Sequence, residues 1–354
     1  MKKIRLLISM ACIGVSTLIA TAHDFTATID GQKIYFNITS KARQTAEVTY
    51  KGSIADVRIP ETEGILEIPA KVKHGKVVYS VTKIGPKAFS GATELTGVIL
   101  PSSVKEIGDF AFEGCTALSK VIFPSGDVKM GQGTFFKCSA LKDLSFGSDW
   151  ETLNLAPYRW SDSLHIVNIP AKVEKVMNLK SIASLREVNV DANNAKFSAY
   201  KGALYNKDYT ILYGVPRSYK GTLKIKEGTT DITQGALIDC PDITLIDIPA
   251  SLQVLSFRET SRMSDLEEIV FRGETPLTTA YNNGQACFLL QVANPSVKIN
   301  VPKDAKKEYA KQLVVTPGEY TESAQTGSIP YMVEAASLPQ AKNIKGLKNF
   351  NDYD

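Results

Sequence analysis

The sequence predicts a solenoid built mainly from β-strands, with short helical or 3-10 turns linking the strands. The first observation is a repeat, because three segments that begin at Val81, Val104 and Asp127 align without a gap at a step of 23 residues. The second is that apolar and polar residues alternate near the end of these segments, as they do in a half-buried strand. One such unit cannot bury its apolar face alone, so stacked neighbours must share a continuous core.

The 23-residue step places residues of one kind in rows, which are Ile84, Ile107 and Met130; Gly85, Gly108 and Gly131; Phe89, Phe112 and Phe135; and Leu95, Leu118 and Leu141. A fourth, degenerate repeat follows, and a fifth repeat from about Val173 is shortened by about two residues. After an interruption, the same offsets return over 232–249, another repeat covers 255–271, and a last strand covers 297–301. We therefore expect one buried column of Phe89, Phe112, Phe135, Tyr158 and Leu237.

The strand of each repeat ends in an alternating run before a proline or its equivalent. In the first repeat, Val98 and Leu100 should point into the core, while Gly97 and Ile99 point outward. Pro101 has no N–H to donate, which suits the point where the chain leaves the sheet. The same alternation predicts outward positions on later strands, which are Lys120, Ile122, Asp143, Ser145, Ile166, Asn168, Glu187, Asn189, Leu245, Asp247, Glu268 and Val270.

The N-terminus has the parts of a secretory signal peptide. Three bases in the first five residues precede an apolar run over 6–20, and small residues at 20 and 22 predict cleavage before His23. A short membrane anchor is the less favoured alternative, because the run is brief. Lipidation of Cys12 is also less favoured, because this cysteine lies inside the apolar run and lacks the usual preceding leucine.

Cleavage would lower the formal net charge from +4 to +1. Such a balanced charge gives no reason to expect a nucleic acid or an acidic membrane as the partner. No other segment of the sequence is long and apolar enough to span a bilayer. We expect an exported monomer that stays in the periplasm, reaches the cell surface or is secreted.

The second repeat, from Val104 to Pro124, reads VKEIGDFAFEGCTALSKVIFP. It resembles the BspA-like class of leucine-rich repeat, found in secreted and surface proteins of bacteria, and the resemblance covers roughly residues 81–302. Repeats four and five depart from the pattern, with Asn154 at the turn glycine and Tyr158 at the phenylalanine. The resemblance implies a right-handed, curved leucine-rich repeat solenoid with a parallel sheet on its concave side. It also implies a role in adhesion or partner binding.

The segments outside the repeats predict capping elements. The region before the first repeat contains strand-like runs, which we expect to cover the open end of the core as a β cap. A tyrosine-rich hairpin interrupts the array, and a short charged helix is expected to close its other end. The predicted organisation is a signal peptide (1–22), an N-terminal β cap (23–80), repeats one to five (81–193), the hairpin interruption (194–227), continued repeats (228–302), and a C-terminal cap with a disordered tail (303–354).

The sequence shows no constellation of residues that carries catalysis. The three histidines lack metal-ligand spacing and no Cys-x-x-Cys occurs, so we expect no metal site. No nucleophile-elbow, phosphate-loop or histidine-helix motif is present, so we expect neither enzymatic activity nor a cofactor, although a triad assembled across repeats stays open. Export would permit a disulfide between stacked cysteines, but we favour reduced, core-facing thiols at Cys115, Cys138, Cys240 and Cys287.

These observations favour an adhesin-like protein that binds a protein or host-matrix ligand without catalysis. The alternatives are a structural spacer of the cell envelope, or a carbohydrate-binding module that uses the tyrosines over 200–219. Ile99 and Ile122 should lie side by side on neighbouring strands, either as part of a contact surface or as ordinary strand formers. We expect the ligand, a protein or a glycan, to contact the concave sheet at Ile99, Lys120, Ile122, Asp143, Ser145, Ile166, Asn168, Glu187 and Asn189.

Overall fold

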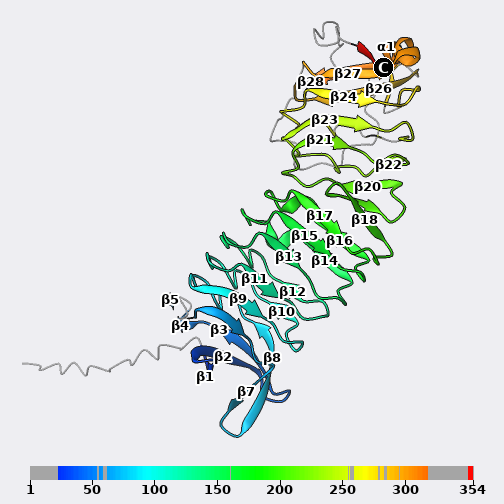
Figure 1. The fold of residues 1–354 in the computed structure, drawn as a ribbon. Helices are drawn as coiled ribbons and strands as arrows, with labels where there is room; N and C mark the ends of the chain where they lie inside the picture. Colours follow the sequence, from blue (N-terminus) through cyan, green and yellow to red (C-terminus); the bar gives the residue numbers. More distant parts are fainter. Residues whose placement is uncertain are drawn as a thin grey trace, which may run out of the picture.

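The computed structural model describes residues 23–53, 56–58, 62–159, 161–253, 255, 259–277, 280–282, 285–294, 296–317 and 350–353. The expected signal peptide lies outside these residues, as does most of the expected C-terminal tail. The described chain forms an elongated β-solenoid of about eight turns, with many strands and little helix (Figure 1). The predicted fold class is therefore confirmed.

The first eight strands lead into the regular array. They are β1 (Phe25–Ile29), β2 (Gln32–Ser40), β3 (Thr45–Thr49), β4 (Lys51–Ser53), β5 (Asp56–Arg58), β6 (Gly64–Glu67), β7 (Lys71–His74) and β8 (Val77–Ile84). Strands β1 to β3 form an antiparallel meander, and β3 then pairs parallel with β8. Phe36 and Val48 are fully buried in the same core as the repeat residues. The N-terminal segment therefore covers the first turn and extends its core.

Each regular turn contributes strands to two sides of the solenoid (Figure 1). One side, which we call the strand face, contains β6 and then β9 (Leu95–Ile99), β11 (Lys120–Ile122), β13 (Asp143–Ser145), β15 (Ile166–Ile169) and β17 (Glu187–Val190). The second side contains β8 and then β10 (Glu106–Ile107), β12 (Lys129–Met130), β14 (Thr152–Asn154) and β16 (Lys175–Met177). The turns also contain two short 3-10 helices, η1 (Ala156–Tyr158) and η2 (Leu179–Ser181).

Strand pairing follows the step of the repeat. Val98 pairs with Val121, and Leu144 pairs with Val167, each 23 residues further on. Val167 pairs with Val188, so the fifth turn is shorter by two residues, as the sequence predicted. A slip of one residue would turn every core side chain outward, so this register decides which residues face solvent.

A column of stacked aromatic rings runs through the core of the first four turns. The rings of Phe89, Phe112, Phe135 and Tyr158 are buried, and successive centroids lie 5.2, 5.5 and 5.6 Å apart with interplanar angles of 8°, 7° and 4°. Leu237 is also buried, but it belongs to a second core cluster, so its predicted place in this column is wrong. The hairpin interruption separates the two clusters and displaces Leu237 from the column.

The interruption joins two cores. Strand β19 pairs antiparallel with β18 and with β20, and β20 pairs parallel with β22, where the turns resume. Side chains of β19 alternate between the cores: Leu204 packs in the first cluster, whereas Ala203 and Tyr205 pack in the second. The strands here are β18 (Phe197–Tyr200), β19 (Ala203–Asn206), β20 (Ile211–Gly214), β21 (Gly221–Lys224) and β22 (Asp231–Ile232).

The C-terminal turns stack parallel strands in the order β21, β23, β24, β27 and β29. Tyr309 of the terminal helix packs on Phe271 at 5.6 Å between ring centroids, and its hydroxyl donates to the carbonyl of Gly273 at 3.0 Å. Residues 350–353 form a strand rather than part of a disordered tail. The elements are β23 (Ile243–Ile248), β24 (Glu268–Phe271), β25 (Ala280–Asn282), β26 (Gln285–Val292), β27 (Lys298–Pro302), η3 (Lys303–Ala305), α1 (Lys306–Gln312), β28 (Leu313–Pro317) and β29 (Phe350–Tyr353).

Three of the four expected thiols are described, and each is free and buried. Cys115 donates its S–H to the carbonyl of Phe89, and Cys138 donates to that of Phe112, both at 3.1 Å. Burial raises the pKa of Cys115 to about 12 and raises that of Cys138 as well. The side chain of Cys287 lies outside the described side chains.

Candidate binding face

The N-terminal part of the strand face carries three of the predicted contact residues. The pairing of β9 with β11 places Ile99 beside Ile122 and Gly97 beside Lys120. Ile122 is 39% exposed and Lys120 is exposed, whereas Ile99 is half-buried. The expected neighbourhood of Ile99 and Ile122 is therefore present, with Ile122 as the more accessible member.

Sequence reasoning missed two residues of this surface. Strand β6 pairs parallel with β9, which places Ile65 beside Gly97 and Glu67 beside Ile99. Ile65 is 60% exposed, and a Cβ atom on Gly97 would lie only 3.2 Å from its Cγ1 atom, so Ile65 covers Gly97. Gly97, which we expected to face outward, is therefore buried. The 32-residue separation of this pair falls outside the repeat step, which is why the sequence did not reveal it.

The next three strands carry the other six predicted residues in two rows. Strand pairing places Asp143, Ile166 and Glu187 in one row, and Ser145, Asn168 and Asn189 in the other. Leu144, Val167 and Val188, which alternate with these residues, are buried. The outward residues are exposed, except Ile166 and Asn168, which are half-buried. The predicted alternation is thus present on these three strands.

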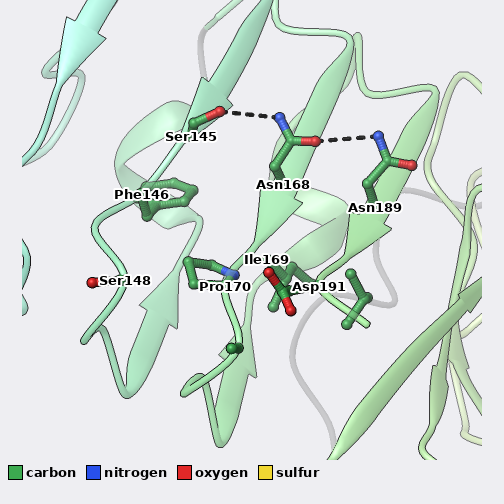
Figure 2. Close-up of a pocket in the computed structure, with 10 residues that line it drawn as sticks. Ser145, Phe146, Ser148, Asn168, Ile169, Pro170, Asn189 and Asp191 are labelled. Carbon is green, nitrogen blue, oxygen red and sulfur yellow. Dashed lines mark hydrogen bonds between the residues drawn. The ribbon is translucent and has the colours of Figure 1, made fainter. Parts of the chain in front are cut away.

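Hydrogen bonds connect one of these rows into a polar ladder, formed by Ser145, Asn168 and Asn189. The amide nitrogen of Asn189 donates to Asn168 Oδ1 at 3.2 Å, and the amide nitrogen of Asn168 donates to Ser145 Oγ at 3.3 Å. Asn168 also donates to the carbonyl of Leu144 at 3.3 Å. Figure 2 shows the ladder crossing three adjacent strands. Each bond restrains a side-chain rotamer, so the ladder is a preformed polar surface.

A shallow hollow of about 430 Å³ lies beside the polar ladder. Phe146, Pro170 and Asp191, which follow the three strands, line it together with the ladder (Figure 2). The hollow therefore combines amide groups, a carboxylate and apolar side chains. Such a mixture of apolar surface and a few placed polar groups is typical of a site that binds another molecule.

The nine predicted residues do not form one continuous sheet. Among the described residues, β6, β9 and β11 make one hydrogen-bonded sheet, and β13, β15 and β17 make another. Ile99, Lys120 and Ile122 lie on the first sheet, and the remaining six residues lie on the second. The polar ladder is thus separated from the isoleucine pair by a break in strand pairing.

The outward positions of the C-terminal turns differ from the prediction. Asp247 is buried, because Arg272 lies against it and donates from Nε to Oδ1 at 2.6 Å and from Nη2 to Oδ2 at 2.9 Å. Val270 is also buried, and strand pairing places it between Asp247 and Asn300. Both residues were expected to point outward, but neither is accessible, because neighbouring side chains cover them. The accessible polar surface is therefore better developed on β13, β15 and β17.

The tyrosines of the interruption mainly pack against the second core. Tyr205 is fully buried, and Tyr200, Tyr209 and Tyr219 are partly buried against the same cluster. The ammonium group of Lys226 lies 4.9 Å from the ring centroid of Tyr200 and 4.6 Å from that of Tyr209. These cation–π contacts already occupy two ring faces that a sugar would need.

The described part of the chain contains no group of three or more side chains placed to hold a metal ion. Among the same residues, no helix has both the length and the apolar character needed to cross a membrane.

Residues 70–199 match a family model described as the BspA type leucine rich repeat region, in six copies. The chain carries a BspA-type leucine-rich repeat region. The BspA-type region includes the strand face from β9 to β17 and the whole polar ladder. The resemblance seen in the sequence is therefore confirmed. No curated protein matches the chain.

Several solved bacterial structures are similar to this chain. The pneumococcal vaccine antigen PcpA is 18% identical, with 83% of this chain and 99% of that chain covered and a TM-score of 0.45. A leucine rich cell surface protein from Faecalibacterium prausnitzii is 21% identical, with coverages of 85% and 96% and a TM-score of 0.33. A leucine-rich repeat protein from Bacteroides ovatus is 18% identical, with coverages of 82% and 82% and a TM-score of 0.31.

Proposed function

We propose that this protein is an exported, non-catalytic binding protein whose strand face engages a protein or host-matrix ligand. The observation that carries the proposal is the polar ladder of Ser145, Asn168 and Asn189 beside the hollow. Its amides are fixed by hydrogen bonds on neighbouring strands, and Asn189 is exposed. A surface that is already ordered loses little conformational entropy on binding, which favours affinity.

The surroundings of the ladder favour a polar partner. Asp143 and Glu187 are exposed in the adjacent row, and Asp191 lines the hollow. These carboxylates would attract lysine or arginine side chains, while the amides can donate to or accept from a peptide backbone. Ile166 between the acidic residues offers apolar area. A basic segment of a protein ligand fits this combination best.

Export is the part of the proposal that rests on the sequence alone. We propose that residues 1–22 are removed and that the mature chain begins at His23. N-terminal sequencing of the protein from its native host should find His23 first. An intact Met1, or a lipid on Cys12, would contradict this processing.

Binding can be tested with the chain from His23 onward on arrays of extracellular-matrix proteins, secreted proteins and glycans. For a ligand found there, the double variant Asn168→Ala with Asn189→Ala should weaken binding at least about tenfold, which corresponds to about 1.4 kcal/mol. Asn154→Ala is the matched control, because this exposed amide lies on the second side of the solenoid and accepts from Asn178 at 2.7 Å. The control should keep the affinity of the unchanged chain.

The same experiment separates the other functions that the sequence left open. A footprint confined to the tyrosines over 200–219 would favour carbohydrate binding by the hairpin instead. Lost affinity on Ile99→Ser with Ile122→Ser, at an unchanged melting temperature, would move the contact to the N-terminal sheet. If no array component binds and cells that lack the protein show only altered envelope integrity, a structural spacer is the better description.

A further inference from the structure

A lysine and a cysteine from opposite sides of the interruption lie in direct contact. Lys180 belongs to η2 in the fifth turn, and Cys240 lies 60 residues later, in the turn that follows the hairpin. The Nζ atom of Lys180 is 2.9 Å from the Sγ atom of Cys240. This contact joins the part of the array before β18 to the part after β22.

The surroundings of the pair favour the neutral forms of both groups. Burial lowers the pKa of the Lys180 amine, and burial raises the pKa of the fully buried Cys240 thiol. The Cys240 thiol raises the pKa of the amine and the Lys180 amine lowers the pKa of the thiol, so each opposes the other's shift. The carboxylates of Asp239 and Glu259 raise the pKa of both groups. A desolvated amine keeps its lone pair available for reaction, unlike an exposed ammonium group.

The equivalent cysteines show that packing alone does not require the lysine. Cys115 and Cys138 occupy the same place in their turns as Cys240, and their S–H groups donate to the carbonyls of Phe89 and Phe112. The sulfur of Cys240 makes corresponding contacts with carbonyl groups, at 3.4 Å to Pro216. Among these three described thiols, only Cys240 has an amine within hydrogen-bond distance of its sulfur.

A hollow of about 450 Å³ gives small molecules access to the lysine. Its lining includes Lys180, Tyr213, Thr233, Gln234 and Gly235. Gly235 donates its backbone N–H to the buried carboxylate of Glu259 at 2.6 Å, which fixes this part of the wall. A molecule as small as hydrogen peroxide fits such a hollow and can reach the amine end of the pair.

We propose that Lys180 and Cys240 form a covalent N–O–S crosslink under oxidation by a peroxide. In the first step, Cys240 passes its thiol proton to Lys180 Nζ, and the Sγ thiolate attacks the O–O bond of hydrogen peroxide. The proton then moves from Nζ to the leaving hydroxide, so that a sulfenic acid and a neutral amine form and one water leaves. In the second, the lone pair of Nζ attacks the O–O bond of a second peroxide, so that an Nζ–O bond forms, a hydroxylamine results and one water leaves. The hydroxylamine oxygen then attacks the sulfenic sulfur, the S–OH bond breaks, and a second water leaves. The product keeps one N–H, and the pair has lost four electrons to two peroxides. Four thiols, which become two disulfides, or two phosphines, which become two phosphine oxides, supply the four electrons that restore the amine and the thiol.

The crosslink would tie the two cores together across the hairpin. It closes a loop of 60 residues between Lys180 and Cys240. Such a tie restricts the unfolded chain, as a disulfide does, so the oxidised protein should melt at a higher temperature than the reduced one. The pair therefore forms a redox-sensitive covalent link between the two cores of the solenoid.

The test treats the full chain with hydrogen peroxide and analyses the digest by mass spectrometry, with and without a phosphine. The expected product is a Lys180–Cys240 peptide pair that has gained one oxygen and lost two hydrogens, and that disappears on reduction. Lys180→Gln and Cys240→Ala should each abolish it, while the control Cys115→Ala should retain it. Circular dichroism of each variant shows that it is folded.

Three results would overturn the proposal. One is a folded chain in which Cys240 stays free or becomes only sulfinic or sulfonic acid. Another is a linked pair that has lost two hydrogens without gaining oxygen, since that is a direct N–S bond. The last is an N–O–S peptide that forms equally from Cys115 or Cys138 and a lysine, since that would show no preference for the observed contact.

Discussion

Trp150 donates its indole N–H to the carbonyl oxygen of Pro124 at 3.1 Å, across the break between β11 and β13. The ring is buried and lies 5.4 Å from the ring centroid of Phe123 and 4.8 Å from that of Phe146. Where strand pairing is interrupted, this side chain therefore connects the second turn to the third. It supplies at one point the contacts that backbone hydrogen bonds provide elsewhere on the strand face.

Trp150→Phe should reduce the free energy of unfolding by about 1–3 kcal/mol, because the buried carbonyl of Pro124 loses its donor. Trp150→Ala should cost about 3–5 kcal/mol, because it also leaves a cavity between the two phenylalanines. Urea denaturation followed by circular dichroism measures both values. Equal stability of Trp150→Phe and the unchanged chain would show that the hydrogen bond contributes nothing.

Phe112→Ala should reduce the free energy of unfolding by about 3–5 kcal/mol, because the ring is fully buried between Phe89 and Phe135. Phe136→Ala is the matched control, since Phe136 is only half-buried and lies outside this column. Phe136→Ala should reduce the free energy of unfolding by clearly less than Phe112→Ala does. If the two variants have the same denaturation midpoint, the column is not the main source of stability in these turns.

Tyr158→Phe should make stability less sensitive to alkaline pH. Burial raises the pKa of Tyr158 well above its ordinary value of 10.0, so the folded state keeps the phenol neutral while the unfolded state releases the proton. The stability contributed by the neutral phenol is thus present below pH 10 and is lost as pH rises above it. At pH 7 the variant should differ by less than about 1 kcal/mol, since its hydroxyl donates only to the sulfur of Met130.

Denaturation midpoints measured between pH 7 and pH 11 check this expectation. Tyr213→Phe is the control, because Tyr213 is 40% exposed, and its midpoints should follow those of the unchanged chain. A steep alkaline loss that persists unchanged in Tyr158→Phe would contradict the assignment.

Arg272→Met should reduce stability by about 1–3 kcal/mol, because it removes both charge-assisted hydrogen bonds from the buried Asp247 carboxylate. Adding Asp247→Asn to that variant should recover part of the loss, because the buried carboxylate would otherwise retain only the Lys224 ammonium group, 4.0 Å away. A double-mutant cycle by thermal denaturation measures the coupling. Additive effects of the two changes would show that the pair is not coupled.

The sequence could predict the parts of the fold that repeat. The step of 23 residues places Val98 with Val121 and the phenylalanines in one column, because identical units stack in register. It could not predict that Ile65 joins the strand face, because that pairing is set by the shape of the N-terminal segment. Nor could it predict that Leu237 leaves the column, because the hairpin shifts every later turn.

The sequence could predict which residues of the candidate site face outward, but not the hydrogen bonds between them. Strand alternation indicated that Ser145, Asn168 and Asn189 face outward. Their hydrogen bonds depend on amide orientations and on the shortened fifth turn, which brings Asn189 opposite Asn168. The burial of Asp247 depends on Arg272, which lies beyond the end of its strand and carries no repeat signal.

The even spacing of the first turns bears on how such a chain can change its length in evolution. An in-frame duplication of 104–126 would bring its own cysteine, phenylalanine and strand to the same places, so both neighbouring turns would find matching partners. A duplication that ends within β19 would not find matching partners. Leu204 packs in the first core and Tyr205 in the second, so in an extra copy each side chain would face the wrong core. Gene slippage should therefore lengthen or shorten the array before the hairpin, and homologues should differ in turn number there while keeping a single copy of β19.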